Sequence, residues 1–142
     1  MVDDTVYVGS YDNSVYALDA VTGMQRWHFE TDGGVVSSPA VVDGTVYVGS
    51  FDNSVYALDA VTGTQQWRFE THDSVESSPA VVDGTVYIGS NDNYVYALDT
   101  ATGKQQWCFE TDDEVESSPA VVDGTVYVGS HDNSVYALGD GD

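Results

Sequence analysis

The sequence predicts an all-β fold, a β-propeller built from four-stranded antiparallel blades. Residues 37–76 are repeated by residues 77–116, with 31 of 40 positions unchanged. Each copy contains four short runs rich in β-branched and aromatic residues, separated by turn residues, and no run has helical periodicity. A repeat of this length with four strands per copy is typical of a propeller blade.

The elements of the first complete copy are assigned from local composition. Asp43-Gly44 stands between two apolar runs as a two-residue hairpin turn that needs positive φ, and Asp52-Asn53 marks a second tight turn. A polar connection, Thr71–Ser78, is long enough to carry the chain from the outer edge of one blade to the inner edge of the next. The predicted strands, from the inner to the outer edge of the blade, are A (Pro39–Val42), B (Thr45–Ser50), C (Ser54–Asp59) and D (Thr64–Glu70).

The repeat predicts a single propeller array over residues 1–142, with fourteen strands or about 3.5 blades. The chain begins after a strand A and ends before a strand D, so each end blade has three strands. Gly139–Asp142 no longer follows the repeat and is interpreted as a polar terminus. The predicted units are a partial blade B-C-D (1–36), two full blades (37–76 and 77–116) and a partial blade A-B-C (117–142).

Acidic residues dominate the composition. The chain has 24 Asp and Glu, 18 of them Asp, against 3 Lys and Arg, for a net charge of -21. Phosphate recognition depends on Lys and Arg, so the composition argues against binding to nucleic acid or to an anionic membrane surface. Salt relieves self-repulsion at this charge density, and the composition resembles that of proteins from extreme halophiles, so we infer a high-salt environment.

Targeting signals are not evident. No apolar run has the length of a membrane span, and the first residues lack the features of a signal peptide. We therefore expect a soluble chain, and its compartment stays open.

Each complete corner between strands C and D carries the pattern Ala-x-Asp-x-x-Thr-Gly-x-x-x-Trp. The Asp carboxylate can accept backbone N–H bonds across the turn, the Thr hydroxyl can add another, and the Gly can take the left-handed conformation that returns the chain into strand D. The indole then has a small Ala beside it and can lie flat between blades, burying on the order of 200 Å² of aromatic surface. The motif residues are Ala17, Asp19, Thr22, Gly23, Trp27, Ala57, Asp59, Thr62, Gly63, Trp67, Ala97, Asp99, Thr102, Gly103 and Trp107.

This pattern resembles the tryptophan-docking motif of PQQ-like (pyrroloquinoline-quinone-type) repeats, found in the propellers of quinoprotein dehydrogenases and of the outer-membrane assembly lipoprotein. The resemblance covers essentially the whole chain. The fourth copy departs from it at Ala137–Gly139, where the Asp is replaced and the chain stops before any Trp. The resemblance implies that Trp27, Trp67 and Trp107 each stack between the Ala of their own motif and the Gly region of the next blade.

The family name raises the question of a quinone cofactor, and we predict none. Quinoprotein sites in the resembling enzymes use a vicinal cysteine disulfide, a calcium shell with an Asp base and a Trp beneath the quinone ring, all unique to particular blades. Here Cys108 is the single cysteine, and the acidic residues recur at equivalent positions in every copy. Similar environments do not supply the divergent pKa values that catalysis needs. We therefore predict no catalytic residue, no cofactor-binding residue and no metal ligand.

The positions that differ between copies are expected on loops and on the outer strand, where substitution is tolerated. His28, His72 and His131 fall at three different blade positions, so they do not converge as a zinc site requires. The acidic run Asp112–Glu114 lacks the spacing of a dedicated calcium loop, which leaves diffuse cation binding. Cys108 is expected to be a free thiol on the outer strand, because no His–Asp pair is placed to activate it.

The two ends of the array predict self-association. An arc that lacks an inner strand at one end and an outer strand at the other has unpaired backbone and uncovered blade faces. We therefore predict a head-to-tail homodimer that closes an eight-bladed ring, the blade number that the resemblance implies, with incomplete blades or strand exchange at the junctions. A seven-bladed ring is the alternative, since two chains supply enough strands for seven sets of four.

Near-identical copies favour a non-enzymatic structural or protein-interaction propeller made of recently amplified repeats. Its protein partner, besides a second copy, is not identified by the sequence. Two alternatives stay open: a fragment of a PQQ-dependent dehydrogenase, and a propeller module that senses a small ligand in its central channel.

Overall fold

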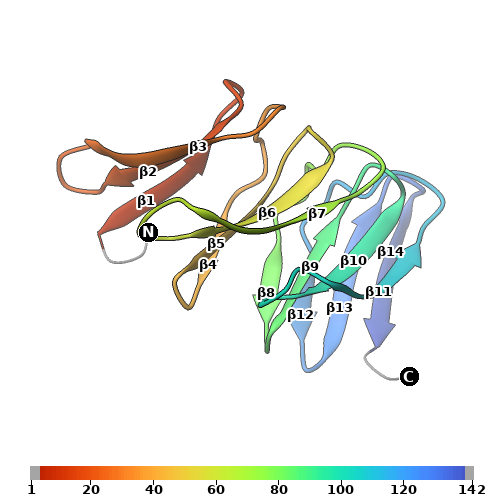
Figure 1. Cartoon of the computed structure of the whole chain (residues 1–142). Coiled ribbons are helices and arrows are strands. Elements are labelled where there is room, and N and C mark those ends of the chain that lie inside the picture. The colour runs from red at the N-terminus through yellow and green to blue at the C-terminus, as the bar shows by residue number, and fades with distance from the viewer. Residues whose placement is uncertain (1–3, 140–142) are drawn as a thin grey trace.

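The computed structural model describes residues 4–139, which form fourteen strands and no helix (Figure 1). The predicted all-β class is therefore confirmed. Across these residues, no helix is long and apolar enough to span a membrane. The predicted polar terminus Gly139–Asp142 begins too early, because Gly139 pairs with Thr125 as the last residue of a strand. The rest of that terminus lies outside the described residues, as do residues 1–3 at the start of the first predicted blade.

The strands form four antiparallel sheets of three, four, four and three members. Within each sheet the strands follow one another in chain order, as expected for hairpin-connected blades. The first sheet contains β1 (Thr5–Gly9), β2 (Ser14–Asp19) and β3 (Gln25–Glu30). The second contains β4 (Ala40–Val42), β5 (Thr45–Gly49), β6 (Ser54–Asp59) and β7 (Gln65–Glu70). The third contains β8 (Ala80–Val82), β9 (Thr85–Gly89), β10 (Tyr94–Asp99) and β11 (Gln105–Glu110). The fourth contains β12 (Ala120–Val122), β13 (Thr125–Ser130) and β14 (Ser134–Gly139).

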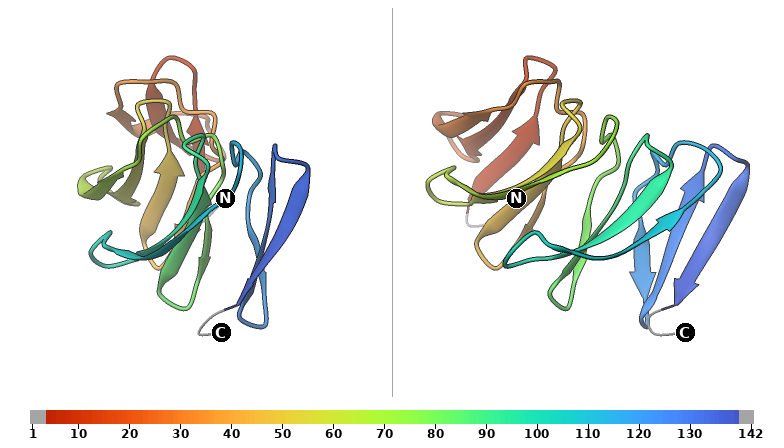
Figure 2. Two further views of the ribbon diagram at one scale, coloured as in Figure 1. Left: turned by 90° about the vertical axis from the view of Figure 1, so that its right-hand side faces the viewer. Right: turned by 45° about the vertical axis from the view of Figure 1, so that its right-hand side comes forward.

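The four sheets lie side by side as the successive blades of an open arc. Figure 2 shows the sheet of β1–β3 at one end and the sheet of β12–β14 at the other. The short strand β8 contacts both β4 and β12, so the first strands of successive sheets adjoin along the inner edge of the arc. The predicted propeller of about 3.5 blades per chain is confirmed.

The turns have the conformations that their residues predict. Asp43 and Gly44 have φ of 51° and 78°, which defines the mirror-image turn that suits the twist of a β-hairpin. Asn53 has φ of 76° in the turn between β5 and β6. Strand β4 begins at Ala40 rather than at the predicted Pro39, because proline has no N–H to donate to the ladder.

Buried aliphatic side chains lie between neighbouring sheets. Val15 of β2 packs in one cluster with Val46 and Val48 of β5. The same contact joins the second sheet to the third and the third to the fourth, through Val55 and Val95. The core is therefore a series of equivalent layers, each shared by two blades.

The connection between β7 and β8 contributes to this core. Val75 is fully buried, and its Cγ1 lies 2.3 Å from where a Cβ on Gly49 would stand. Its backbone N–H donates to the Ser50 carbonyl at 3.0 Å. Val75 lies on a connecting loop, but this position is Val in all three connections, and its side chain fills the space beside a glycine of its own blade. Val35 and Val115 lie in the same way over Gly9 and Gly89.

This packing is testable with two matched glycines. In Gly89→Ala the new Cβ would lie 2.3 Å from Cγ1 of Val115, whereas in Gly129→Ala the nearest atom would be Oγ of Ser117 at 3.6 Å. We expect G89A to lower the free energy of unfolding by about 1–3 kcal/mol and G129A to change it by less than about 1 kcal/mol. Denaturant unfolding in molar KCl, followed by tryptophan fluorescence, measures both; equal losses would contradict the packing described for Val115.

Candidate functional site

The corner between β6 and β7 is held by its own side chains. Asp59 Oδ1 accepts the backbone N–H groups of Val61 at 2.9 Å and Thr62 at 3.0 Å. The Thr62 hydroxyl accepts the N–H of Thr64 at 3.3 Å, and Gly63 has φ of 76°. The carboxylate and the hydroxyl of the motif thus accept the backbone N–H groups of the turn, and the glycine adopts the positive φ that the turn needs.

The same hydrogen bonds recur in the first and third sheets. Asp19 accepts from Val21 and Thr22, and Asp99 accepts from the residues at the equivalent positions. These bonds to the ionised form, together with the Arg26 guanidinium 2.8 Å from Asp19, lower the pKa of Asp19 to about 2. A carboxylate with a depressed pKa stabilises the fold above its unfolded pKa, and that stability is lost as the pH falls toward the folded value.

The tryptophan of each corner reaches the next sheet. Trp27 donates its Nε1–H to the Ala60 carbonyl at 2.9 Å, and Trp67 donates to the Thr100 carbonyl at 2.8 Å. Both indoles are buried. Trp27 also lies against Gly63 of the next sheet, where a Cβ would stand 2.6 Å from its ring. The third sheet presents Gly103 to Trp67 in the same way.

The alanines of the motif lie opposite the tryptophans on the neighbouring strand. Ala57 pairs with Trp67 across β6 and β7, and the register shifts directly after this pair. Ala17 and Ala97 pair in the same way with Trp27 and Trp107. The ladder thus changes register at the residue that leads into each motif corner.

Trp107 occupies a different environment. It is half-buried and contacts the ring of Tyr87, with centroids 6.0 Å apart. The position one repeat beyond Thr100 falls after Gly139, outside the described part of the chain. The structure therefore brings two of the three motif tryptophans into contact with a following motif corner.

A second contact between blades was not predicted from the sequence. Asp52, interpreted above only as a turn residue, accepts the backbone N–H of Asp32 from the preceding connection at 3.1 Å. It also accepts the N–H of Ser54 and the hydroxyl of Tyr56. Burial and this carboxylate raise the pKa of Tyr56. Asp92 and Asp132 accept equivalent bonds from His72 and Asp112.

The signal for this contact was present in the sequence, because an Asp stands at this turn in all four copies. The turn uses only one carboxylate oxygen, Oδ1 of Asp52, and leaves the second oxygen without a role. Only the three-dimensional arrangement shows which backbone group the second oxygen accepts.

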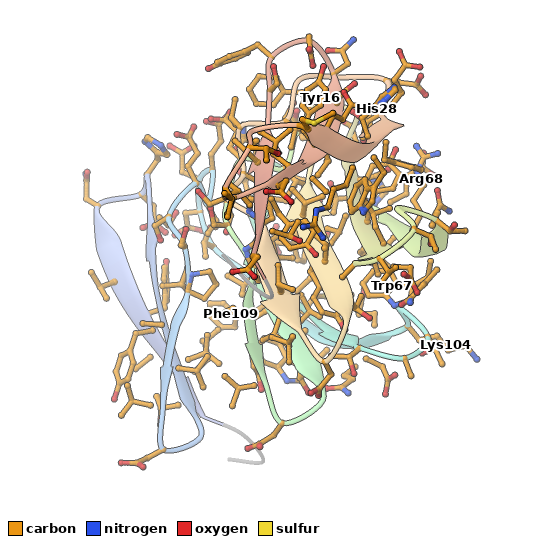
Figure 3. The ribbon with its side chains drawn as sticks, turned by 90° about the vertical axis from the view of Figure 1, so that its left-hand side faces the viewer. Tyr16, His28, Trp67, Arg68, Lys104 and Phe109 are labelled. Carbon is orange, nitrogen blue, oxygen red and sulfur yellow. The ribbon has the colours of Figure 1, made fainter. Side chains whose placement is uncertain are left out.

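The non-repeating residues of the outer strands lie apart from these contacts. Figure 3 shows Tyr16 and His28 side by side in the first sheet, with ring centroids 5.9 Å apart, and Arg68 on the second sheet. Arg68 donates to the Ser54 hydroxyl at 2.7 Å and lies 3.8 Å from Glu70. Cys108 is an exposed free thiol on β11. These side chains do not converge on a common centre.

One cluster of titratable groups is unique to a single junction. Atoms of Glu114, Glu116 and His131 that could ligate a metal lie within 4.8 Å of one another, and His131 Nε2 is 3.3 Å from Glu116 Oε1. Sequence reasoning compared the histidines with each other and missed this cluster, which joins one histidine to two carboxylates of another loop. In the preceding junction Asn91 stands in place of the histidine and donates to Glu76 at 2.7 Å.

The hydrogen bond and the charge of Glu116 raise the pKa of His131. The pKa of Glu114 is also raised, by burial and by Glu116. Among the residues that the structure describes, these three form the group able to hold a divalent cation, with an open side toward solvent. The arrangement supplies two carboxylate ligands and an imidazole that can bind a proton or a metal ion.

Equivalent layers, repeated corners and blade-to-blade hydrogen bonds define this protein as a repeat propeller module. The family model described as outer membrane protein assembly factor BamB matches residues 1–78 and again residues 72–142. The chain therefore belongs to this family of PQQ-like repeat propellers. No curated protein matches the chain.

Solved structures share the fold. BamB from Moraxella catarrhalis is 25% identical with a TM-score of 0.84, over 94% of this chain and 46% of that chain. Quinohemoprotein alcohol dehydrogenase ADHIIG from Pseudomonas putida HK5 is 26% identical with a TM-score of 0.81, over 92% of this chain and 27% of that chain. The computationally designed protein Ika4, at 20% identity, shares the fold with a TM-score of 0.89 over 99% of this chain and 88% of that chain. The chain thus spans less than half the length of the natural proteins that it matches.

The contact of Trp27 with Gly63 is testable against a glycine of the same conformation. Gly63 has φ of 76° and touches Trp27, whereas Gly23 has φ of 75° and no atom within 4 Å of an added Cβ. Alanine costs about 1 kcal/mol at either position through its backbone conformation, and G63A adds a clash worth about 1–3 kcal/mol more. Unfolding followed by circular dichroism in molar KCl measures the difference; if G23A costs as much as G63A, the indole contact contributes nothing.

The ion pair of His131 with Glu116 is testable by titration. Because the folded pKa of His131 is raised, the imidazolium stabilises the fold below the unfolded pKa, and this contribution is lost as the pH rises through the folded value. We expect the imidazole resonances of His131, followed by NMR, to titrate above 6.5. Glu116→Gln should move the midpoint down. An unchanged midpoint in E116Q would show that the carboxylate does not act on the histidine.

Proposed function

We propose that this chain is a non-enzymatic propeller module whose role is structural or in protein interaction. The observation that carries the proposal is that the recurring polar side chains hold the backbone in place. The Asp carboxylates of the motif corners and of the turns equivalent to Asp52 recur at equivalent positions in successive sheets, and their hydrogen bonds fix a turn or join two blades.

The hydroxyl pair at the blade junction illustrates this use. Ser50 Oγ donates to Thr31 Oγ1 at 3.2 Å, while Thr31 donates to the carbonyl of Gly33 at 2.6 Å. Ser90 and Thr71 make the same contact one junction later. Neither serine hydroxyl is hydrogen-bonded to a histidine in the described part of the chain, so this pair lacks the base that activates a nucleophilic hydroxyl.

Several side chains that a quinone cofactor would need already have partners within the fold. PQQ carries carboxylates that require cationic partners, and Arg26 is already paired with Asp19 at 2.8 Å. Trp27 and Trp67 are enclosed between sheets with their N–H groups engaged, so neither presents a free ring face to a planar cofactor. The thiol of Cys108 lies alone on an outer strand. These features support a role that does not depend on the cofactor.

A second candidate is a fragment of a PQQ-dependent dehydrogenase. It is favoured by the likeness to the alcohol dehydrogenase of Pseudomonas putida HK5, of which this chain matches 27%. A fragment of that size would supply blades of the propeller and would leave the rest of a cofactor site to other parts of a longer protein.

Titration with PQQ and Ca²⁺ tests the proposal. We expect no saturable, stoichiometric change in tryptophan fluorescence, because Trp27 and Trp67 are already packed between blades and the net charge of the chain is -21. Free tryptophan amide at the same absorbance corrects for light absorbed by the quinone. Tight one-to-one binding would overturn the scaffold proposal and favour the dehydrogenase fragment.

A further inference from the structure

The two end sheets expose faces that are buried at every junction inside the chain. On β2, β6 and β10, Val15, Val55 and Val95 are fully buried against the following sheet. The equivalent residue of β14, Val135, is 78% exposed. A shallow pocket over this face is lined by Val135 together with Gly129 and Ser134.

The first sheet exposes the complementary face. Val46 and Val48 of β5 are fully buried against the preceding sheet, as are Val86 and Ile88 of β9. The equivalent residues of β1, Val6 and Val8, are 38% and 41% exposed. The motif glycine of this sheet, Gly23, also has no indole over it, unlike Gly63 and Gly103.

These two faces are the halves of the contact that repeats inside the chain. In the first interior junction, Val15 meets Val46 and Val48 in a single buried cluster. A second copy that placed its Val6 and Val8 against Val135 would reproduce that cluster with the same residue types. This contact joins a different face of each copy, so the two copies pack head to tail. In a dimer with two-fold symmetry the same contact forms twice, which closes the ring.

We propose that a second copy of this chain covers both end faces, with Val135 of each copy packed against Val6 and Val8 of the other. The closed ring contains eight blades, because each chain contributes four sheets. The structural match to BamB supports two copies, since this chain superposes on 46% of that chain. The inference rests on the proposed role as an interaction module and names its partner.

Light scattering and sedimentation equilibrium in molar KCl test the closure without any cofactor. We expect a mass twice the 15.3 kDa of the chain, and a larger dimer fraction as salt screens two chains of charge -21. A monomer at all salt concentrations overturns the proposal, and so does an open-ended series of larger species.

Single charges on the two faces test the head-to-tail geometry. Val135→Asp and Val8→Asp should each weaken dimerisation by at least about tenfold. The matched control is Val21→Asp, which adds the same charge at a corner residue that is 85% exposed, and it should leave the mass unchanged. Because all three side chains are exposed, circular dichroism should remain that of the unaltered chain.

Mixing the two face variants gives the decisive result. Head-to-tail packing predicts that V135D and V8D together form a heterodimer through their two unaltered faces, although neither forms a dimer alone. If only one variant weakens association, the face that it alters pairs with itself and the proposed geometry is wrong. Binding of PQQ would overturn the scaffold role without changing these masses, so the two proposals fail separately.

Discussion

The structure depends on one repeated contact, the packing of each sheet against the next. A blade of three or four short strands cannot bury its own faces, so its stability comes from its neighbours. Here the contact has an aliphatic layer around Val15, Val46 and Val48, and an outer corner where Trp27 crosses to Gly63 and the Ala60 carbonyl. The aliphatic layer supplies buried area, and the indole N–H and the glycine set the position of one sheet on the other.

The acidic composition is compatible with this packing because many of the carboxylates lie at turns. Asp59 binds the backbone of its own corner, and Asp52 binds the backbone of the preceding connection. Each carboxylate thus carries charge and holds the backbone at the same time. The cost is long-range repulsion, which grows with every added blade and is screened by salt.

Local features of the sequence predicted most of the fold, and the family resemblance implied the contact of Trp27 and Trp67 with the next blade. Other contacts between blades were not predicted. Asp43-Gly44 and the alternation of β5 identify a hairpin without reference to the rest of the chain. The motif predicted the turn bonds of Asp59, since both partners are within a few residues. Burial of Val75 and the joining of His131 to Glu116 both depend on segments far apart in sequence. The second is also unique to one junction, which a period shared by all blades cannot reveal.

The connections between sheets have a kinetic consequence. The segment Thr71–Ser78 ties the second sheet to the third and inserts Val75 between them, so an opened junction closes again at the high effective concentration of a short tether. In the proposed dimer, by contrast, the contact between the two end faces joins separate chains, so dilution separates it while the three tethered junctions stay closed.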